Sequence, residues 1–246
     1  MCTLEKQGNL YILTLTGPDE HRLNPTLIDS IQSALRQLRL QPLSPSSALI
    51  TTAHGKFFCN GYDLARARSA PSAAITQSYV RLMSSKFRSL ISDLISLPMP
   101  TIAAVTGHAS AAGFILALAH DYVLMRKDRG FLYMSELDIG LAIPAWFMAM
   151  LKCKIGDANV RREVVLTAAK LTAKMAVERR IVHSAHDSAE ATVEAAIGLG
   201  NELVSKKWEG QAYASNRLVV LGEVLDKIGF DETVEGRNGD SIKSKL

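Results

Sequence analysis

The stretch "TIAAVTGHASAAGFILALAHDYVLMRK", residues 101–127, decides the fold class. Its first part, "TIAAVTG", is an apolar run typical of a buried strand, and "DYVLMRK" at its end predicts another. Between them, small residues lead into an apolar run that predicts a helix over 111–120. Tiny residues at the start of a helix indicate that something approaches the backbone closely. No ionisable side chain occurs from Ala109 to Ala119, so this helix brings no acid or base of its own.

The rest of the chain continues the alternation of strands and helices. Gly8-Asn9 between two β-like runs predicts a hairpin. Asn24 followed by Pro25 predicts a helix start. Further elements are expected as strands at 48–52 and 131–136, and as helices at 75–97, 145–154, 157–168, from Thr172 onward and throughout 188–228. The pattern predicts an α/β protein with an all-helical C-terminal region.

Composition places few limits on function. The 246 residues suit one large domain, or a core with a smaller appendage. A net charge of +4, from 28 basic and 24 acidic residues interleaved along the chain, is too small to indicate a nucleic-acid partner. Three widely spaced cysteines predict reduced thiols, with neither a disulfide framework nor a metal site. No run approaches the ~20 apolar residues of a membrane span.

The chain ends in "SIKSKL", and the terminal tripeptide Ser244, Lys245, Leu246 is a peroxisomal import address. A receptor reads this signal, so it must lie on an exposed tail. The polar, glycine-containing "EGRNGDSIK" before it is typical of such a tail. We therefore expect a peroxisomal protein that binds the import receptor; a chance tripeptide is the alternative.

Two motifs resemble the crotonase, or enoyl-CoA hydratase/isomerase, superfamily. "GKFFCNGYDL" at 55–64 is similar to its F-x-x-G-x-D-L/I segment, and "IAAVTGHASAAGFILALAHDYVLM" at 102–125 is similar to its A-x-x-G-x-A-x-G-G-G helix entry. With the SKL terminus, the set looks most like the plant-type peroxisomal enoyl-CoA isomerases. The resemblance implies a spiral of ββα units.

The resemblance also implies an organisation of the chain and an assembly. We expect a crotonase-like core with the acyl-CoA site over 1–187, a helical oligomerisation region over 188–240 and a targeting tail over 241–246. Homotrimers, or hexamers made of two trimers, are expected. The apolar stripes of 188–228 could equally pack on the chain's own core.

By the same resemblance, backbone N–H groups of Tyr62 and Ala112 form an oxyanion hole for the enolate oxygen of a thioester. Each such donor is worth roughly 3–4 kcal/mol, and a helix N-terminus at Ala112 favours the anion further. Gly61 and Gly113 are expected to let the backbone turn and the thioester approach. The alternatives are an ordinary turn at "NGY" and tight helix packing at "SAAG".

Charged residues around the first motif are weaker candidates. Lys56 and Asp63 are assigned to substrate binding, with Arg66 and Arg68 as further cations for the CoA phosphates. Solvated surface charge is the alternative for the basic residues. For Asp63 the alternative is a structural role, in which it orders its own loop through backbone hydrogen bonds.

The acids decide the reaction that the resemblance implies. Hydratases of the superfamily use two glutamates, and the position of the first is Ile115 here, which cannot activate water. The second position is matched by Glu136, in "YMSELDIGL". Its apolar neighbours should raise its pKa toward the range of a general base. Asp138 is the competing carboxylate, and it would point to the same side if the segment were extended.

A single base and an oxyanion hole suit a proton shuttle, in which Glu136 moves a proton from C2 to C4 of a 3-enoyl-CoA. The expected activity is that of a Δ3,Δ2-enoyl-CoA isomerase in peroxisomal fatty-acid β-oxidation. No metal and no cofactor are expected, because CoA is part of the substrate. The alternatives are another acyl-CoA substrate, such as one from auxin-precursor β-oxidation, and an acyl-CoA binder without catalysis.

Overall fold

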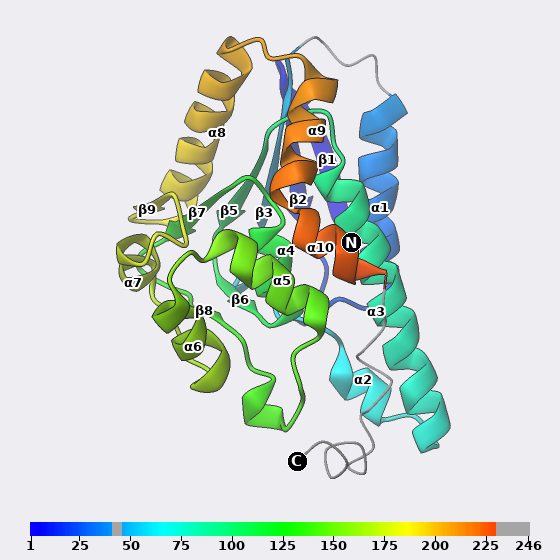
Figure 1. Ribbon diagram of the computed structural model, residues 1–246. Helices are drawn as coiled ribbons and strands as arrows, with labels where there is room; N and C mark the ends of the chain where they lie inside the picture. Colours follow the sequence, from blue (N-terminus) through cyan, green and yellow to red (C-terminus); the bar gives the residue numbers. More distant parts are fainter. Residues whose placement is uncertain (41–45, 230–246) are drawn as a thin grey trace.

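A six-stranded sheet forms the centre of the structure, a computed structural model that describes residues 1–40 and 46–229 (Figure 1). Its strand order is β1-β2-β3-β5-β7-β9. The strands are β1 (Cys2–Gln7), β2 (Leu10–Leu15), β3 (Ala48–Ala53), β5 (Thr101–Val105), β7 (Tyr122–Arg126) and β9 (Ser184–His186). The pair β1 and β2 is the predicted antiparallel hairpin, and the other pairs are parallel. Gly8, with φ +60°, provides the left-handed turn that this hairpin needs.

A second, smaller sheet is parallel and has the order β4-β6-β8. Its strands are β4 (Phe57–Cys59), β6 (His108–Ser110) and β8 (Leu132–Tyr133). Each directly follows a strand of the large sheet and precedes helical structure. The helices concerned are α2 (Leu64–Arg68) and α3 (Ala73–Ile95), α4 (Ala112–Leu118), and the 3-10 turn η2 (Leu137–Ile139) with α5 (Ala145–Lys154). The chain therefore repeats a ββα unit, and the predicted α/β class with ββα units is confirmed.

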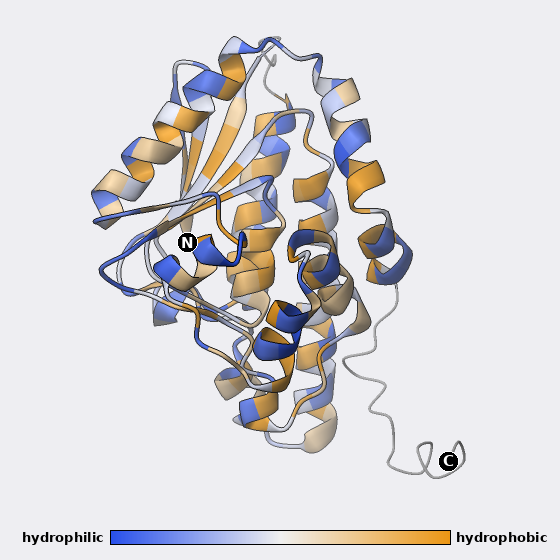
Figure 2. Ribbon diagram, turned by 60° about the vertical axis from the view of Figure 1, so that its left-hand side comes forward, coloured by the Kyte–Doolittle hydropathy of each residue, from blue (hydrophilic) through white to orange (hydrophobic). Residues whose placement is uncertain are grey.

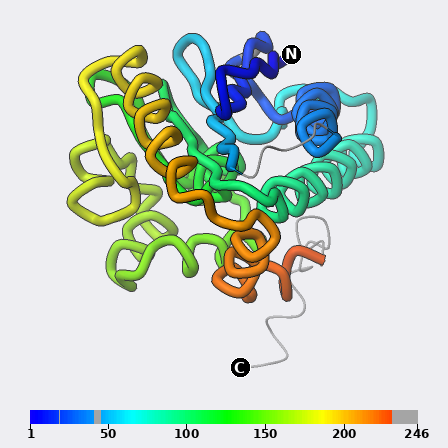
Figure 3. The backbone as a smooth tube through the Cα atoms, turned by 90° about the horizontal axis from the view of Figure 1, so that it is seen from above, coloured from blue at the N-terminus to red at the C-terminus, as the bar shows by residue number. Residues whose placement is uncertain are grey.

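Alternate residues of the large sheet face two different layers, as the period of two in a strand requires. Ile102 and Ala104 pack with α8 (Ala189–Ser205) in one apolar cluster. Ala103 and Val105 belong to the larger cluster on the opposite face. Viewed from above, α8 lies on one side of the strands, and α1 (Pro25–Leu40) and α3 lie on the other (Figure 3).

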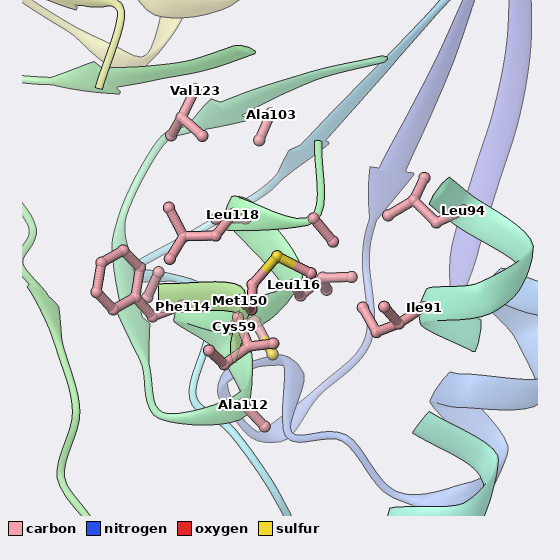
Figure 4. Packing of buried hydrophobic residues seen from close by; sticks show 14 of the residues in the cluster. Cys59, Ile91, Leu94, Ala103, Ala112, Phe114, Leu116, Leu118, Val123 and Met150 are labelled. Carbon is pink, nitrogen blue, oxygen red and sulfur yellow. The ribbon is translucent and has the colours of Figure 1, made fainter. Parts of the chain in front are cut away.

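The larger cluster surrounds α4, all of whose residues are buried. Figure 4 shows the α4 side chains Phe114, Leu116 and Leu118 together with Met150 of α5 and with Leu94 of α3. Strands of the large sheet are mostly orange or pale in Figure 2, and every residue of the inner strands β3 and β5 is buried. A helix that is apolar all round is buried on every side by neighbouring elements. The core therefore fixes the position of α4 and of its first residue, Ala112.

The remaining elements enclose this core. They are η1 (Asp19–His21), α6 (Ala158–Leu166), α7 (Ala173–Glu178), α9 (Gly210–Val220) and α10 (Gly222–Ile228). The predicted start of α1 is confirmed, because the side chain of Asn24 accepts a hydrogen bond from the Leu27 N–H at 2.9 Å. No helix of the described ranges is long and apolar enough to cross a bilayer.

The helices after residue 188 pack on the chain's own core. α8 covers the large sheet and α10 lies against α5. The sequence left open whether the apolar stripes of 188–228 contact another subunit or the chain's own core, and in this structure they contact the core. The oligomerisation role of 188–240 stays a prediction, and the targeting tail with Ser244, Lys245 and Leu246 lies outside the described residues.

Candidate active site

Three segments converge at the carboxyl edge of the small sheet. Tyr62 follows β4, Ala112 follows β6, and Glu136 follows β8. Because the carboxyl ends of parallel strands meet at one edge, three positions far apart in the sequence lie together. This edge is also where α/β folds place their ligands. The predicted base and the two predicted oxyanion donors thus lie at the same edge of the small sheet.

Gly61 brings the first two segments into direct contact. A Cβ atom built on Gly61 would lie 3.0 Å from the carbonyl oxygen of Ser110 and 3.5 Å from the nitrogen of Ala112. Its φ of +68° is also a conformation that favours glycine. Any larger residue would push the Tyr62 loop away from the start of α4. Gly61 therefore sets the separation of the two predicted oxyanion donors.

The turn before Ala112 is strained and anchored. Ala111 adopts φ 50° and ψ −121°, which an L-residue rarely occupies. Its N–H donates to the carbonyl of Tyr133 at 2.9 Å, and the hydroxyl oxygens of Ser110 and Ser135 are 3.3 Å apart. Ala112 is the first residue of α4, so its N–H has no acceptor within the helix. These contacts tie the donor turn to the segment that carries Glu136.

Tyr62 is held through both its backbone and its ring. Leu23 forms a parallel bridge with Tyr62, and the Leu23 N–H donates to the Gly61 carbonyl at 2.7 Å. The phenol ring meets the ring of Phe87 edge-on at 5.7 Å and lies 6.4 Å from that of Phe147. Phe87 and Phe147 belong to α3 and α5, so the core fixes this loop.

Glu136 is a buried carboxyl group. It is 7% exposed, and within the described chain its Oε2 has no hydrogen-bond partner. Burial raises the pKa of Glu136 to about 7, although hydrogen bonds from the backbone N–H groups of Glu136 and Ser135 favour the ionised form. The predicted rise in pKa is confirmed. A base with this pKa can take up and release a proton near neutral pH.

The strand expected over 131–136 ends earlier, and this separates the two candidate carboxylates. β8 contains only Leu132 and Tyr133, and Glu136 precedes the 3-10 turn η2. With about three residues per turn, neighbours two apart no longer share a side. Asp138 is consequently exposed while Glu136 is buried. The extended geometry that would have placed both on one side is wrong.

This geometry agrees with what the chain is similar to. A family model described as enoyl-CoA hydratase/isomerase matches residues 5–218. The chain belongs to the enoyl-CoA hydratase/isomerase family. Its fold is the crotonase fold: an enoyl-CoA hydratase from Mycobacterium ulcerans has a TM-score of 0.81 at 20% identity, with 96% of each chain covered. A probable enoyl-CoA hydratase from Mycobacterium tuberculosis has a TM-score of 0.82 at 18% identity, covering 99% of this chain and 97% of that one.

Relatives of much higher identity come from Arabidopsis thaliana. "Enoyl-CoA delta isomerase 1, peroxisomal" is 60% identical over 225 residues, which cover 92% of this chain and 91% of that protein. "Enoyl-CoA delta isomerase 2, peroxisomal" is 50% identical over 235 residues, covering 95% and 98%. "Enoyl-CoA delta isomerase 3" is 53% identical over 225 residues, covering 91% and 93%.

In this member of the hydratase/isomerase family, two further predicted residues, Asp63 and Gly113, have structural roles. Asp63 caps α2 by accepting the Arg66 N–H at 3.1 Å, so the structural role considered for it is confirmed. Gly113 faces the backbone of Cys59, where a Cβ atom would lie 2.1 Å from the carbonyl oxygen. The glycine is therefore required by packing between α4 and β4. Contacts of Asp63 and Gly113 with substrate stay predictions.

Lys56 and Ile115 occupy opposite environments. Lys56 is exposed, with its Nζ 5.6 Å from the centre of the Phe57 ring. Arg66 and Arg68 are exposed too, so a contact of any of these cations with CoA stays a prediction. Ile115, which the resemblance places where hydratases carry their first glutamate, is fully buried in the core. Its side chain offers no group that could bind or deprotonate water.

Other titratable groups near the site are unsuited to the chemistry. Burial raises the pKa of the Cys59 thiol to about 12, and burial lowers the pKa of His120 to about 4. The His120 ring is satisfied by the Leu116 carbonyl at 3.0 Å and by the Thr51 hydroxyl at 2.8 Å. No cluster of three or more metal-ligating side chains occurs in the described ranges.

Sequence reasoning missed two features. Residues 20–23 hold the Tyr62 loop, and Arg217 forms a buried ion pair with Asp121 at 2.6 Å. In this part of the sequence only the helix start at Asn24 and Pro25 gives a local signal, and the ion pair joins positions far apart along the chain. No local sequence pattern predicts the contacts of residues 20–23 with the Tyr62 loop or the Arg217–Asp121 ion pair.

Proposed function

We propose that this chain is a Δ3,Δ2-enoyl-CoA isomerase of peroxisomal fatty-acid β-oxidation. It moves the double bond of a 3-enoyl-CoA to give the trans-2-enoyl-CoA. The observation that carries this proposal is one buried carboxyl group, Glu136, at the same sheet edge as Tyr62 and Ala112, with Ile115 in place of a second acid. The names of the Arabidopsis relatives support the activity and the compartment.

The reaction is a proton transfer within one substrate. The Glu136 carboxylate removes a proton from C2, where the thioester and the adjacent double bond make the C–H acidic. The electron pair spreads into a dienolate whose oxygen accepts hydrogen bonds from the Tyr62 and Ala112 N–H groups. The protonated Glu136 then returns the proton to C4, leaving the double bond between C2 and C3. No atom is gained or lost, and the base is regenerated.

The role of the buried environment follows from the pKa of Glu136. A carboxylate whose pKa is about 7 is a stronger base than an ordinary glutamate, and its acid form is stable enough to carry the proton from C2 to C4. Because the same group performs both transfers, the chemistry requires no metal and no cofactor of the protein's own. CoA enters as part of the substrate.

A spectroscopic assay tests this function. Purified protein supplied with a 3-enoyl-CoA should produce the absorbance of a conjugated 2-enoyl thioester. Glu136→Gln should lower kcat by about 100- to 10,000-fold, the usual contribution of a general base, while acyl-CoA binding persists. Asp138→Asn is the matched control, because this exposed carboxylate lies two residues away and should be dispensable.

Two results would contradict the proposal. Activity retained by Glu136→Gln would show that another group is the base. Wild-type protein and Glu136→Gln that both bind acyl-CoA but are equally inert would identify a binder without catalysis.

Targeting and assembly are part of the same proposal. The Ser244, Lys245, Leu246 terminus supports import through the peroxisomal receptor, and the family resemblance supports a homotrimer or hexamer. Removing the last three residues should leave a fluorescent fusion outside peroxisomes. Sedimentation of the purified protein gives the number of subunits.

A further inference from the structure

Residues 20–23, called the clasp below, run along the loop 59–63 that carries Tyr62. The Leu23 N–H donates to the Gly61 carbonyl at 2.7 Å, and the Leu23 carbonyl accepts the Asp63 N–H at 3.4 Å. These two bonds flank Tyr62 on both sides along the chain. The loop is therefore fixed by a neighbouring segment from far away in the sequence.

The first half of the clasp holds the start of the loop. The Asn60 N–H donates to the Glu20 carbonyl at 3.1 Å, and the Cys59 thiol donates to the His21 carbonyl at 3.1 Å. Three residues of the clasp, Glu20, His21 and Leu23, thus bind the loop. A loop held at several points retains its backbone geometry better than one held by a single contact.

The clasp itself adopts a conformation that side chains disfavour. Glu20 has φ 61° and His21 has φ 52°, two consecutive non-glycine residues in the left-handed region. His21 is buried, and its Nδ1–H donates to the carbonyl of Phe57 at 2.9 Å. Strain of this kind persists only where the surroundings hold it, and it clusters at functional sites.

Glu20 is the side chain at the centre of these contacts. Its Oε2 accepts from Nδ2 of Asn60 at 2.6 Å and from Nη2 of Arg22 at 2.9 Å. Asn60 directly precedes Gly61, the residue whose backbone touches the start of α4. The Glu20 carboxylate therefore restrains the approach of the Tyr62 loop to Ala112 from outside the site.

We propose that Glu20 is a positioning residue of the isomerase, which acts through Asn60 to hold the Tyr62 N–H at the distance that the thioester oxygen requires. This inference rests on the proposed function. Glu20 lies on the clasp and does not act on the reacting carbons. Its contribution should appear in the chemical step rather than in the binding of the ground state, because an oxyanion donor matters most when charge develops on oxygen.

A double-mutant cycle on full-length protein tests this role. Glu20→Ala and Asn60→Ala should each lower kcat by about tenfold, with KM within about twofold of wild type. The double variant should be no slower than either single variant, because both remove the same bond. Glu20→Gln retains an acceptor oxygen for Asn60 and should recover most of kcat.

Asp29→Ala is the matched control. It removes another partly exposed ion pair, between Asp29 and Lys86 at 2.6 Å, from the surface of α1. This variant should leave kcat and KM unchanged. A loss of kcat here would mean that surface charge in general, and not the Glu20–Asn60 bond, affects the rate.

A spectroscopic measurement separates positioning from a structural role. Hexanoyl-CoA has no double bond to move, so it reports on the oxyanion hole alone. Binding to wild-type protein should shift its thioester carbonyl band to lower frequency, and Glu20→Ala should reduce that shift. A folded Glu20→Ala protein with the full shift and normal kcat would overturn the inference, as would additive effects in the cycle.

Failure of this inference differs from failure of the proposed function. If wild-type protein does not isomerise a 3-enoyl-CoA, the proposed function is wrong. If wild-type protein is active and Glu20→Ala is equally active, only the role of Glu20 is wrong.

Discussion

Glu136 and Asp138 are two residues apart in the sequence, yet the 3-10 turn that begins after Glu136 leaves one inside the protein and the other in solvent. The difference matters because burial raises the pKa of Glu136 to about 7. Desolvation penalises the charged form, and among the described residues no cation contributes to offset it at Glu136. One backbone turn therefore distinguishes the proposed general base from an ordinary surface acid.

The pH dependence of the reaction should report this pKa. Only ionised Glu136 can take the proton from C2, so kcat/KM should fall as the pH falls, with a midpoint at about 7 and a tenfold loss per pH unit well below it. Asp138→Asn should leave the midpoint in place. A midpoint near 4.5, the ordinary value for glutamate, would mean that the carboxyl group is solvated in the free enzyme.

At the scale of elements, the close packing of α4 on β4 sets the position of Ala112, the proposed oxyanion donor at the start of α4. Gly113 lies so close to β4 that a Cβ atom would come within 2.1 Å of the Cys59 carbonyl oxygen and 2.7 Å of its carbon. Both atoms belong to the backbone of β4, so no side-chain rotation can relieve the clash. The helix and the strand must separate to admit a side chain, and Ala112 would move with the helix.

Gly113→Ala should consequently lower both stability and activity. We expect a loss of about 1–3 kcal/mol in the free energy of unfolding, measured by urea titration, together with a lower kcat. Gly198→Ala, in the interior of α8 with open space around it, is the control and should gain up to about 1 kcal/mol from helix propensity. A wild-type kcat in Gly113→Ala would show that the position of the Ala112 N–H does not depend on the close packing of α4 against β4.

At the scale of the whole molecule, Arg217 joins three distant parts of the chain. From α9 it pairs with Asp121 through two bonds of 2.6 Å and donates to the carbonyls of Ile95 and Leu97 at 3.1 and 2.7 Å. Burial tends to raise the pKa of Asp121, but the hydrogen bonds and charge of Arg217 outweigh it, so the pKa is lowered overall. The pair links the C-terminal helices to the end of α3 and to the starts of β5 and β7.

Arg217→Met should reduce the free energy of unfolding by about 3–5 kcal/mol at neutral pH, because it leaves the Asp121 charge buried and unpaired. Because the pKa of Asp121 is lower in the folded state than in the unfolded state, the ion pair stabilises the wild-type protein at every pH above the ordinary pKa of aspartate. This stabilisation is lost as the pH falls through the folded-state pKa of Asp121. Lys127→Ala, which removes the exposed pair with Asp187, should change stability by less than about 1 kcal/mol. Equal effects of the two substitutions in denaturant unfolding would contradict this account.

Much of the fold could be predicted because it depends on local sequence patterns. The hairpin at Gly8, the cap at Asn24 and the helix over 145–154 each depend on neighbours along the chain, and each is confirmed. The approximate place of the site was implied by the resemblance of residues 55–64 and 102–125 to the enoyl-CoA hydratase/isomerase superfamily. The strand predicted over 131–136 is too long, because β8 pairs only at Leu132 and Tyr133 and the chain turns into η2 at Leu137.

The sequence by itself determined the types of group available for chemistry: a glutamate in an apolar stretch, small residues at a helix entry, and a helix from 111 to 119 without any acid or base. Only the tertiary structure decided which carboxyl group is buried, why Gly113 is required, and which segment holds the Tyr62 loop. The physical reason is that desolvation, steric exclusion and hydrogen bonding between distant segments depend on which atoms are close in space.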